Sequence, residues 1–259
     1  MPPAPPQLTR QLPVIKAFQH MLSSVLNHWR LVARFSLPWL ALVAVTNIID
    51  LKLQPDIAIT PGEFKLNVFD IISLVVGVVA SSSIAVSWHR LILIDEPMTA
   101  VPQFRIDKIV VTYIARSLLI VAICFVPALA IAVAAQLMPQ GFVVIWLAVV
   151  LQLFVFATRM SISLPGLAIG NSQFKFHQAM EATRGNNLRV LGLLLLTFLS
   201  IIGLALFVEI IFTALSTLLP GWGLALALLI SIPVQLVSIL ISTSLLTSLY
   251  GFYAEHRDF

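Results

Sequence analysis

The chain has 259 residues, of which 59% are hydrophobic and 10% are charged, and its mean hydropathy is +1.02. Soluble domains carry about 25% charged residues, so this composition excludes an ordinary soluble protein and leaves no room for a separate soluble domain. The net charge of +4 and the pI of about 9.6 fit basic loops that lie against anionic lipid, rather than nucleic-acid binding.

The N-terminal region has two parts. The proline-rich stretch MPPAPPQLTRQLP predicts a flexible tail over residues 1–13. Residues 14–30 place apolar side chains at three- and four-residue steps on one face and polar ones on the other, which predicts an interfacial helix on the membrane surface. Packing of this helix against the cytoplasmic end of the bundle is the alternative, and the two arrangements are compatible.

Long apolar runs follow in chain order, and each can cross a bilayer as a helix. They predict six spans, at about residues 31–49, 68–88, 109–137, 142–162, 190–219 and 224–253. The runs are continuous rather than alternating, which excludes β-barrel strands. The predicted fold class is an all-α polytopic membrane protein, with residues 14–259 forming one domain of six transmembrane helices and short cytoplasmic amphipathic helices.

One of these short helices is predicted at residues 176–183, between spans 4 and 5, with Gly185 ending it in a left-handed conformation. Similar amphipathic segments precede spans 1 and 3, so the chain divides into three units, each a cytoplasmic segment followed by a two-span hairpin. This division is a weak internal repeat, of a kind common in transporters.

Basic residues give the orientation. Twelve of the fifteen Lys and Arg residues fall on one side of the arrangement, Lys52 and Lys65 fall on the other, and Arg116 lies within span 3. Cytoplasmic loops carry the excess of Lys and Arg in membrane proteins. The charge distribution therefore predicts that both termini are cytoplasmic.

Motifs with known chemistry are scarce. The five histidines fall in cytoplasmic segments or at span ends, which favours solvated or interfacial side chains, and none has metal-ligand spacing. Cys124, the only cysteine, is interpreted as a small buried hydrophobe. No catalytic residue, metal or cofactor is predicted, which favours a non-enzymatic protein without deciding the question. Small residues at four-residue spacing indicate close helix packing; they are Gly77, Ser81 and Ala85, and Gly166 with Gly170.

Two arginines inside the spans suggest a site, because a charge in hydrocarbon is costly. Counting residues from the turn between spans 3 and 4 puts Arg116 and Arg159 at similar depths near the cytoplasmic boundary. The planar guanidinium suits phosphate or carboxylate, so we predict an anion or lipid-headgroup site, with Arg90 and His89 as helpers. The alternative is snorkelling to headgroups or pairing with nearby acidic residues; these are Asp95, Glu96 and Glu181.

Two acidic residues inside the spans are also of functional interest. Asp70 lies near the outer mouth of span 2, where an interfacial position is the alternative. Glu209 lies deeper in span 5 and would either pair with a polar face of another helix or take part in a proton or cation relay.

The segment SLPGLAIG, followed by FHQAMEATRGNNLRVLGLLLL, resembles part of the membrane domain attached to some glycerophosphodiester phosphodiesterases and its stand-alone relatives in bacterial inner membranes. Pro165, residues 179–183, Gly185, Asn186 and Arg189 match that pattern. The stretch WHRLILIDEP resembles a second recurring signature of such proteins. The resemblance implies a multi-pass protein of the bacterial inner (plasma) membrane. It implies no phosphodiesterase activity, because the matching segments contain no part of the catalytic domain.

Three functions remain open at this stage. The first is a non-enzymatic envelope or complex-associated factor, with membrane lipids and other membrane subunits as partners and without nucleic acid. The second is a small permease or channel, for which a water-filled path to Asp70 or Glu209 would be evidence. The third is a lipid-handling protein, for which a lateral, lipid-sized groove would be evidence.

Overall fold

The computed structural model describes residues 10–53, 67–97, 104–135, 143–171, 173–219 and 221–259. This part of the chain forms helices without any strand, and six of the helices are long and apolar enough to cross a membrane. The predicted all-α, six-span fold class is therefore confirmed. The helices are α1 (Val14–Leu53), α2 (Val68–Ile94), α3 (Lys108–Ala135), α4 (Val143–Ser161), α5 (Ser163–Ala168), α6 (Phe176–Ala182), α7 (Asn187–Leu218) and α8 (Gly223–Tyr253).

Some predictions concern segments outside the described residues. These are the first nine residues of the proline-rich tail, Lys65 in the loop after α1, and the turn between spans 3 and 4 together with the adjoining ends of those spans, residues 136–142.

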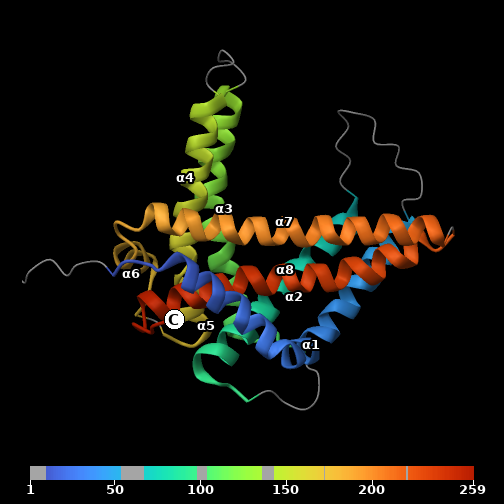
Figure 1. Cartoon of the computed structure of the whole chain (residues 1–259), viewed down its shortest axis with the longest axis horizontal. Helices are drawn as coiled ribbons and strands as arrows, with labels where there is room; N and C mark the ends of the chain where they lie inside the picture. The colour runs from blue at the N-terminus through green and yellow to red at the C-terminus, as the bar shows by residue number, and fades with distance from the viewer. Residues whose placement is uncertain (1–9, 54–66, 98–103, 136–142, 172, 220) are drawn as a thin grey trace, which may run out of the picture.

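The first helix differs from the prediction. α1 is a single helix of 40 residues, where the sequence predicted an interfacial helix and a separate span. At ~1.5 Å per residue it is about 60 Å long, twice the ~30 Å of the hydrocarbon core, so much of it extends beyond the core. Pro38 lies inside the helix, lacks an N–H donor and crowds the preceding turn, and α1 changes direction along its course (Figure 1).

The apolar side chains on the N-terminal half of α1 lie in two environments, one buried against other helices and one exposed. Ala17 and Met21 are fully buried against the other helices, whereas Ile15, Leu26 and Trp29 are 61%, 71% and 60% exposed. Large apolar side chains on an exposed edge suit the membrane interface. Packing against the bundle therefore occurs on one face of this helix, and its position at the membrane surface stays a prediction.

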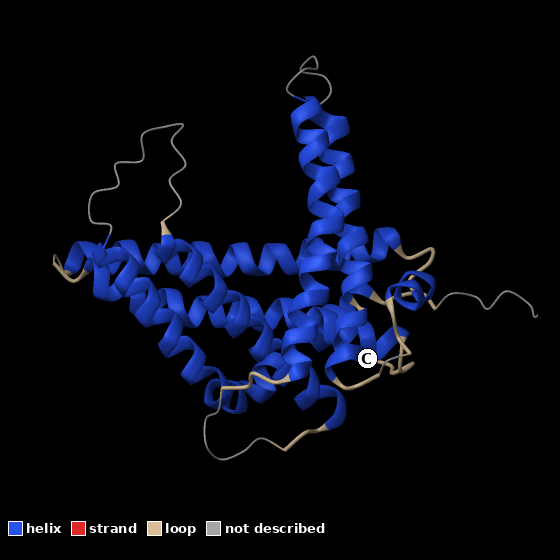
Figure 2. Ribbon diagram, turned by 180° about the vertical axis from the view of Figure 1, so that it is seen from behind, coloured by secondary structure: helices blue, strands red, loops and turns tan. Residues whose placement is uncertain are grey.

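Consecutive long helices pair into hairpins, because α1 packs against α2, α3 against α4, and α7 against α8. Figures 1 and 2 show the α3–α4 hairpin standing across the direction of α7 and α8 instead of alongside them. The outer half of α3 is accordingly exposed at apolar residues such as Phe125, Val126 and Leu129. Cavities lie between this hairpin and helices α2, α7 and α8, and we call this region the wedge.

The core lies at the end of the bundle where the chain termini meet. Its largest fully buried side chains include Trp88 of α2, Ile162 between α4 and α5, Leu193 of α7 and Tyr250 of α8. Gly166 in α5 permits a close approach here, because a Cβ at this position would lie 2.9 Å from Cε2 of Tyr250. The predicted packing role is confirmed for Gly166 but is wrong for Gly170, which follows α5 with a φ of 83° and where a Cβ would meet nothing within 4 Å.

The polar turn between α6 and α7 ties the N-terminal segment to the bundle. The Asn186 side chain accepts a hydrogen bond from the Leu12 N–H and donates one to the Arg10 carbonyl, each at 3.1 Å, and Arg189 donates to the Leu12 carbonyl at 3.0 Å. Arg10 in turn forms an ion pair with Asp258. The two ends of the described chain therefore lie at the same end of the bundle, and so on the same side of a membrane.

The short helix predicted at residues 176–183 is present as α6, with Ala179 fully buried and Glu181 exposed. Gly185 follows it with a φ of 78°, a conformation that glycine adopts without strain.

Candidate functional site

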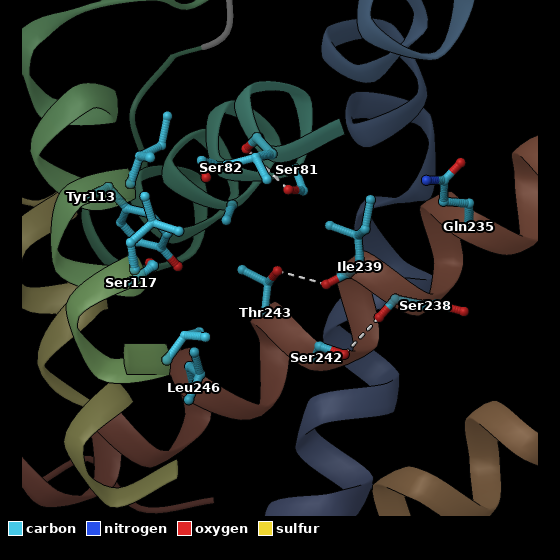
Figure 3. A pocket seen from close by; sticks show the side chains of 15 residues that line it. Ser81, Ser82, Tyr113, Ser117, Gln235, Ser238, Ile239, Ser242, Thr243 and Leu246 are labelled. Carbon is cyan, nitrogen blue, oxygen red and sulfur yellow. Dashed lines mark hydrogen bonds between the residues drawn. The ribbon is translucent and has the colours of Figure 1, made fainter. Parts of the chain in front are cut away.

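The largest described cavity is an open cleft of about 520 Å³ between α2, α3 and α8 (Figure 3). It lies within three membrane-spanning segments. The residues that line it are Val78, Ser81, Ser82, Ala85, Tyr113, Ile114, Ser117, Leu118, Val121, Gln235, Ser238, Ile239, Ser242, Thr243 and Leu246.

Two smaller cavities adjoin this cleft. One of about 350 Å³ lies between α3, α4 and α5, and shares Ser117 and Val121 with the cleft. The other, of about 240 Å³, lies between α4, α7 and α8, and shares Ser242 and Leu246. Because they share wall residues, the three cavities together follow the wedge beneath the α3–α4 hairpin.

The cleft wall combines apolar surface with hydroxyl groups. Seven of its fifteen side chains carry a hydroxyl, one carries an amide, and none is charged. Several hydroxyls donate to carbonyls of their own helix: Ser81 to Val78 at 3.1 Å and Thr243 to Ile239 at 2.6 Å, for example. Such a wall can accommodate hydrocarbon while offering hydrogen bonds at fixed positions.

A buried hydrogen-bonded chain supports one side of the cleft. His89 of α2 is fully buried; its Nδ1 lies 2.9 Å from Oγ1 of Thr247, and its Nε2 lies 3.2 Å from the hydroxyl oxygen of Tyr113. Tyr113 also lines the cleft. The favoured interpretation of the histidines as solvated or interfacial is wrong for His89, because partners from α3 and α8 satisfy both ring nitrogens in the interior.

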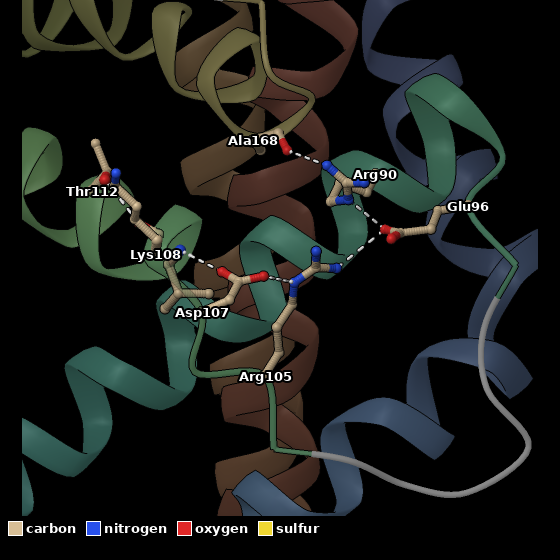
Figure 4. A network of polar contacts seen from close by, with 8 residues as sticks. Arg90, Glu96, Arg105, Asp107, Lys108, Thr112 and Ala168 are labelled. Carbon is tan, nitrogen blue, oxygen red and sulfur yellow. Dashed lines mark hydrogen bonds and ion pairs between the residues drawn. The ribbon is translucent and has the colours of Figure 1, made fainter.

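A network of ions joins the C-terminal end of α2 to the start of α3 (Figure 4). Glu96 accepts from Arg90 at 2.5 Å and from Arg105 at 3.1 Å, and Arg90 also donates to the Ala168 carbonyl at 2.9 Å. Partial burial disfavours the ionised Glu96, but the hydrogen bonds and charges of the two arginines outweigh it and lower the pKa of this carboxyl. The network therefore braces α2, α3 and α5 through a charged carboxylate.

Asp107 extends the network to the start of α3. It accepts from Arg105 at 3.0 Å and from the Val110 N–H at 2.9 Å, which is the position of a helix N-cap. Burial opposes its ionisation, but the hydrogen bonds of Val110 and Arg105 lower the pKa of Asp107 overall.

Arg159 is almost completely buried and is held by neutral acceptors. Its three guanidinium nitrogens donate to Oγ1 of Thr183 at 2.7 Å, to Oδ1 of Asn187 at 2.7 Å and to the Met180 carbonyl at 2.6 Å. These contacts tie α4 to α6 and to the first residue of α7. Arg159 is thus a structural brace between these helices.

The other members of the predicted anion site have separate partners. Arg116 lies over the ring of Phe176 in α6, with its guanidinium carbon 5.4 Å from the ring centre, which is within cation–π range. Both Arg116 and Arg159 therefore reach α6, whereas Arg90 belongs to the ion network and His89 to the buried chain. An anion or headgroup shared by the four residues stays a prediction.

The two acidic residues within the predicted spans occupy different environments. Asp70 is in the first turn of α2, where its carboxylate accepts from the Asn67 N–H at 2.8 Å as part of a capping box. Glu209 lies on an exposed face of α7. Neither lines any of the three cavities described above.

The cleft was not predicted from the sequence, because small residues that line part of its wall were interpreted as a helix-packing face. A Cβ at Gly77 would meet nothing within 4 Å, and Ser81 and Ala85 line the cleft. The close-packing prediction is therefore wrong for Gly77 and Ser81, whereas Ala85 is buried in a core cluster with Val110 and Tyr113 of α3. The available signal was the run of serines in ASSSIAVS together with Ser238, Ser242 and Thr243, all hydroxyl residues within apolar spans.

Within the described residues, no group of three or more His, Cys, Asp or Glu side chains could hold a metal ion. Comparisons with known proteins add no relative, since no family model, curated protein or solved structure matches this chain.

Proposed function

We propose that this protein is a non-enzymatic lipid-handling protein that binds a membrane lipid in the cleft between α2, α3 and α8. The observation that supports the proposal is the cleft itself. Its volume of about 520 Å³ lies in the range of about 300–1,000 Å³ that is usual for small-molecule sites. Its wall is apolar with interspersed hydroxyls and belongs to membrane-spanning helices, so a lipid can enter it sideways from the bilayer.

The permease alternative is less well supported. It relied on Asp70 and Glu209 together with the proline kinks and the internal repeat, and neither acidic residue contributes to a described cavity. Asp70 has a sufficient structural role as a capping residue of α2.

A second candidate function is that of a subunit or assembly factor of a membrane complex. It is favoured by the surroundings of Glu209, since Leu206, Phe207 and Ile210 are 60%, 62% and 69% exposed on the same helix. A carboxylate on a lipid-facing apolar surface is costly, and a polar group of a partner helix would remove that cost. Lipid binding and such an association are compatible.

The resemblance to the membrane domain of glycerophosphodiester phosphodiesterases is part of the proposal. So are a bacterial inner-membrane location and cytoplasmic termini. The basic segments that predict this orientation would lie at the end of the bundle that holds both termini.

Native mass spectrometry of the purified protein tests the proposal. Ser242 lines two of the cavities and is exposed, so Ser242→Phe fills the wedge without entering the core. Ser216→Phe is the matched control, because Ser216 also donates to a carbonyl of its own helix but lines none of the three cavities. We expect lipid to be retained by the wild type and by Ser216→Phe and to be lost by Ser242→Phe. Equal retention by both variants would count against the cleft as the site.

A further inference from the structure

The hydrogen-bond donors and acceptors that remain free in the cleft wall restrict the class of lipid that can bind there. A hydroxyl has one proton to donate and two lone pairs that accept. Ser81, Ser242 and Thr243 use their protons on carbonyls of their own helices, at 3.1, 2.9 and 2.6 Å (Figure 3). What these three side chains still offer to a ligand are oxygen lone pairs, so they act as acceptors.

The buried histidine chain gives Tyr113 the same polarity. Thr247 donates its proton to the Thr243 carbonyl at 2.9 Å, so its oxygen accepts from Nδ1–H of His89. The described surroundings of the His89 ring contain no carboxylate partner, and a fully buried unpaired charge is unfavourable. The ring is therefore neutral and carries a single proton, on Nδ1. Nε2 then has no proton and accepts from the Tyr113 hydroxyl. Tyr113 then also presents a lone pair towards the cleft that it lines.

Three hydroxyls in the wall, those of Ser82, Ser117 and Ser238, have no hydrogen bond to the described residues and keep a proton to donate. Of these, Ser82 is buried, at 7% exposed. Buried hydroxyls in proteins are nearly always paired. A ligand polar group in the cleft would supply the partner for Ser82.

The absence of charge in the described wall restricts the ligand further. None of the fifteen lining residues can neutralise a phosphate or an ammonium group. The nearest arginine in sequence, Arg116, lies over Phe176 of α6 instead of lining the cleft. A charged head group in this cleft would lose hydration without gaining a counter-charge, which is unfavourable.

We infer that the cleft binds an uncharged lipid whose head group both donates and accepts hydrogen bonds, as the hydroxyl of a diacylglycerol or a long-chain alcohol does. This inference rests on the proposed function, because it specifies the lipid class for the same cleft. The acyl chain lies along the apolar wall, and the head-group hydroxyl donates its one proton to the lone pair of Thr243 and accepts from Ser82.

The test uses two photoactivatable probes with identical diazirine-bearing acyl chains, a diacylglycerol and the corresponding phosphatidic acid, which differ only in the phosphate. The full chain is reconstituted in nanodiscs with each probe and irradiated, and adducts are mapped to peptides of α2, α3 and α8. We expect the diacylglycerol to label cleft residues at least about tenfold more than the phosphatidic acid, since burying an unpaired charge costs more than one hydrogen bond contributes.

Variants of Thr243 test the acceptor role. Thr243→Val has nearly the same shape but lacks the oxygen, and should lower diacylglycerol labelling about fivefold, the effect of one hydrogen bond. Thr243→Ser retains the oxygen and should label as the wild type does. The matched control is Thr46→Val, since Thr46 also donates to a carbonyl of its own helix, Val43, but lines none of the cavities.

The outcomes separate this inference from the proposed function. Equal or stronger cleft labelling by the phosphatidic acid would overturn the inference while leaving lipid binding in place, and so would unchanged labelling of Thr243→Val. Labelling spread evenly over all lipid-facing helices with both probes would show bulk lipid only and overturn the proposed function as well.

Discussion

Replacement of Arg159 by methionine should destabilise the fold strongly. The side chain makes three hydrogen bonds, to Thr183, Asn187 and the Met180 carbonyl. Hydrogen bonds to charged groups contribute about 1.5–3 kcal/mol each, and removal of the buried charge returns several kcal/mol of desolvation. The difference leaves a net loss of about 2–5 kcal/mol in the free energy of unfolding.

The control for this prediction is Arg184→Met. Arg184 carries the same charge and lies on the turn after α6, but its side chain is exposed and makes no hydrogen bond to the described residues. A surface substitution of this kind changes stability by about 0.5 kcal/mol or less. Unfolding in mixed micelles with increasing SDS, followed by circular dichroism, measures both variants.

Equal stability of the Arg159→Met and Arg184→Met variants would refute the reasoning, because it would mean that Arg159 is solvated and does not hold α4 against α6 and α7. Arg159→Lys provides an intermediate case. It retains the charge but cannot reproduce the planar set of three donors, so its stability should fall between those of the wild type and Arg159→Met.

Further predictions concern packing, pH and topology. Gly166→Ala should cost about 1–3 kcal/mol by overpacking against Tyr250, measured by the same SDS titration, whereas Gly77→Ala, with open space around it, should be neutral or stabilising. Because the folded-state pKa of Glu96 is lowered from its ordinary 4.5, its ion pairs stabilise the protein above pH 4.5 and are lost as the pH falls through the lowered value. The melting temperature of the wild type should then fall more steeply in acid than that of Glu96→Gln, with Glu181→Gln as an exposed control. Reporter fusions after Asn67 and Phe259 should lie in opposite compartments, with Phe259 in the cytoplasm; an external Phe259 would contradict the orientation.

Hydropathy alone was sufficient to predict six spans, because burial of apolar helices in hydrocarbon depends on local composition and length. It could not predict that α1 continues without a break from Val14 to Leu53, since amphipathic and fully apolar sections of one helix differ in pattern but not in backbone conformation. The short helix α6 was predictable because Gly185 marks its end and its apolar residues share one face.

The site was not predictable because its contacts join distant parts of the chain. His89 meets Tyr113, 24 residues away, and Thr247, 158 residues away, and no local pattern around His89 distinguishes this buried position from an interfacial one. Small and hydroxyl residues on α2 suit either a packing face or a cleft wall. Which of the two occurs depends on the angle of the α3–α4 hairpin, a property of the tertiary arrangement.

Several residues around the start of α7 that carry the resemblance to the phosphodiesterase membrane domain have structural roles. Asn186 and Arg189 hold the N-terminal segment, and the neighbouring Asn187 holds Arg159. Because these side chains form hydrogen bonds within the fold, we place the proposed ligand site in the uncharged cleft and not in this basic segment.

A structure of the protein in a lipid nanodisc, determined with a bound antibody fragment, would show whether a lipid occupies the cleft between α2, α3 and α8. We expect elongated density in the cleft along Ser238, Ser242 and Thr243, ending in a polar group close to Tyr113. Direct packing of α3 against α8, with the cleft closed and without lipid between them, would contradict it.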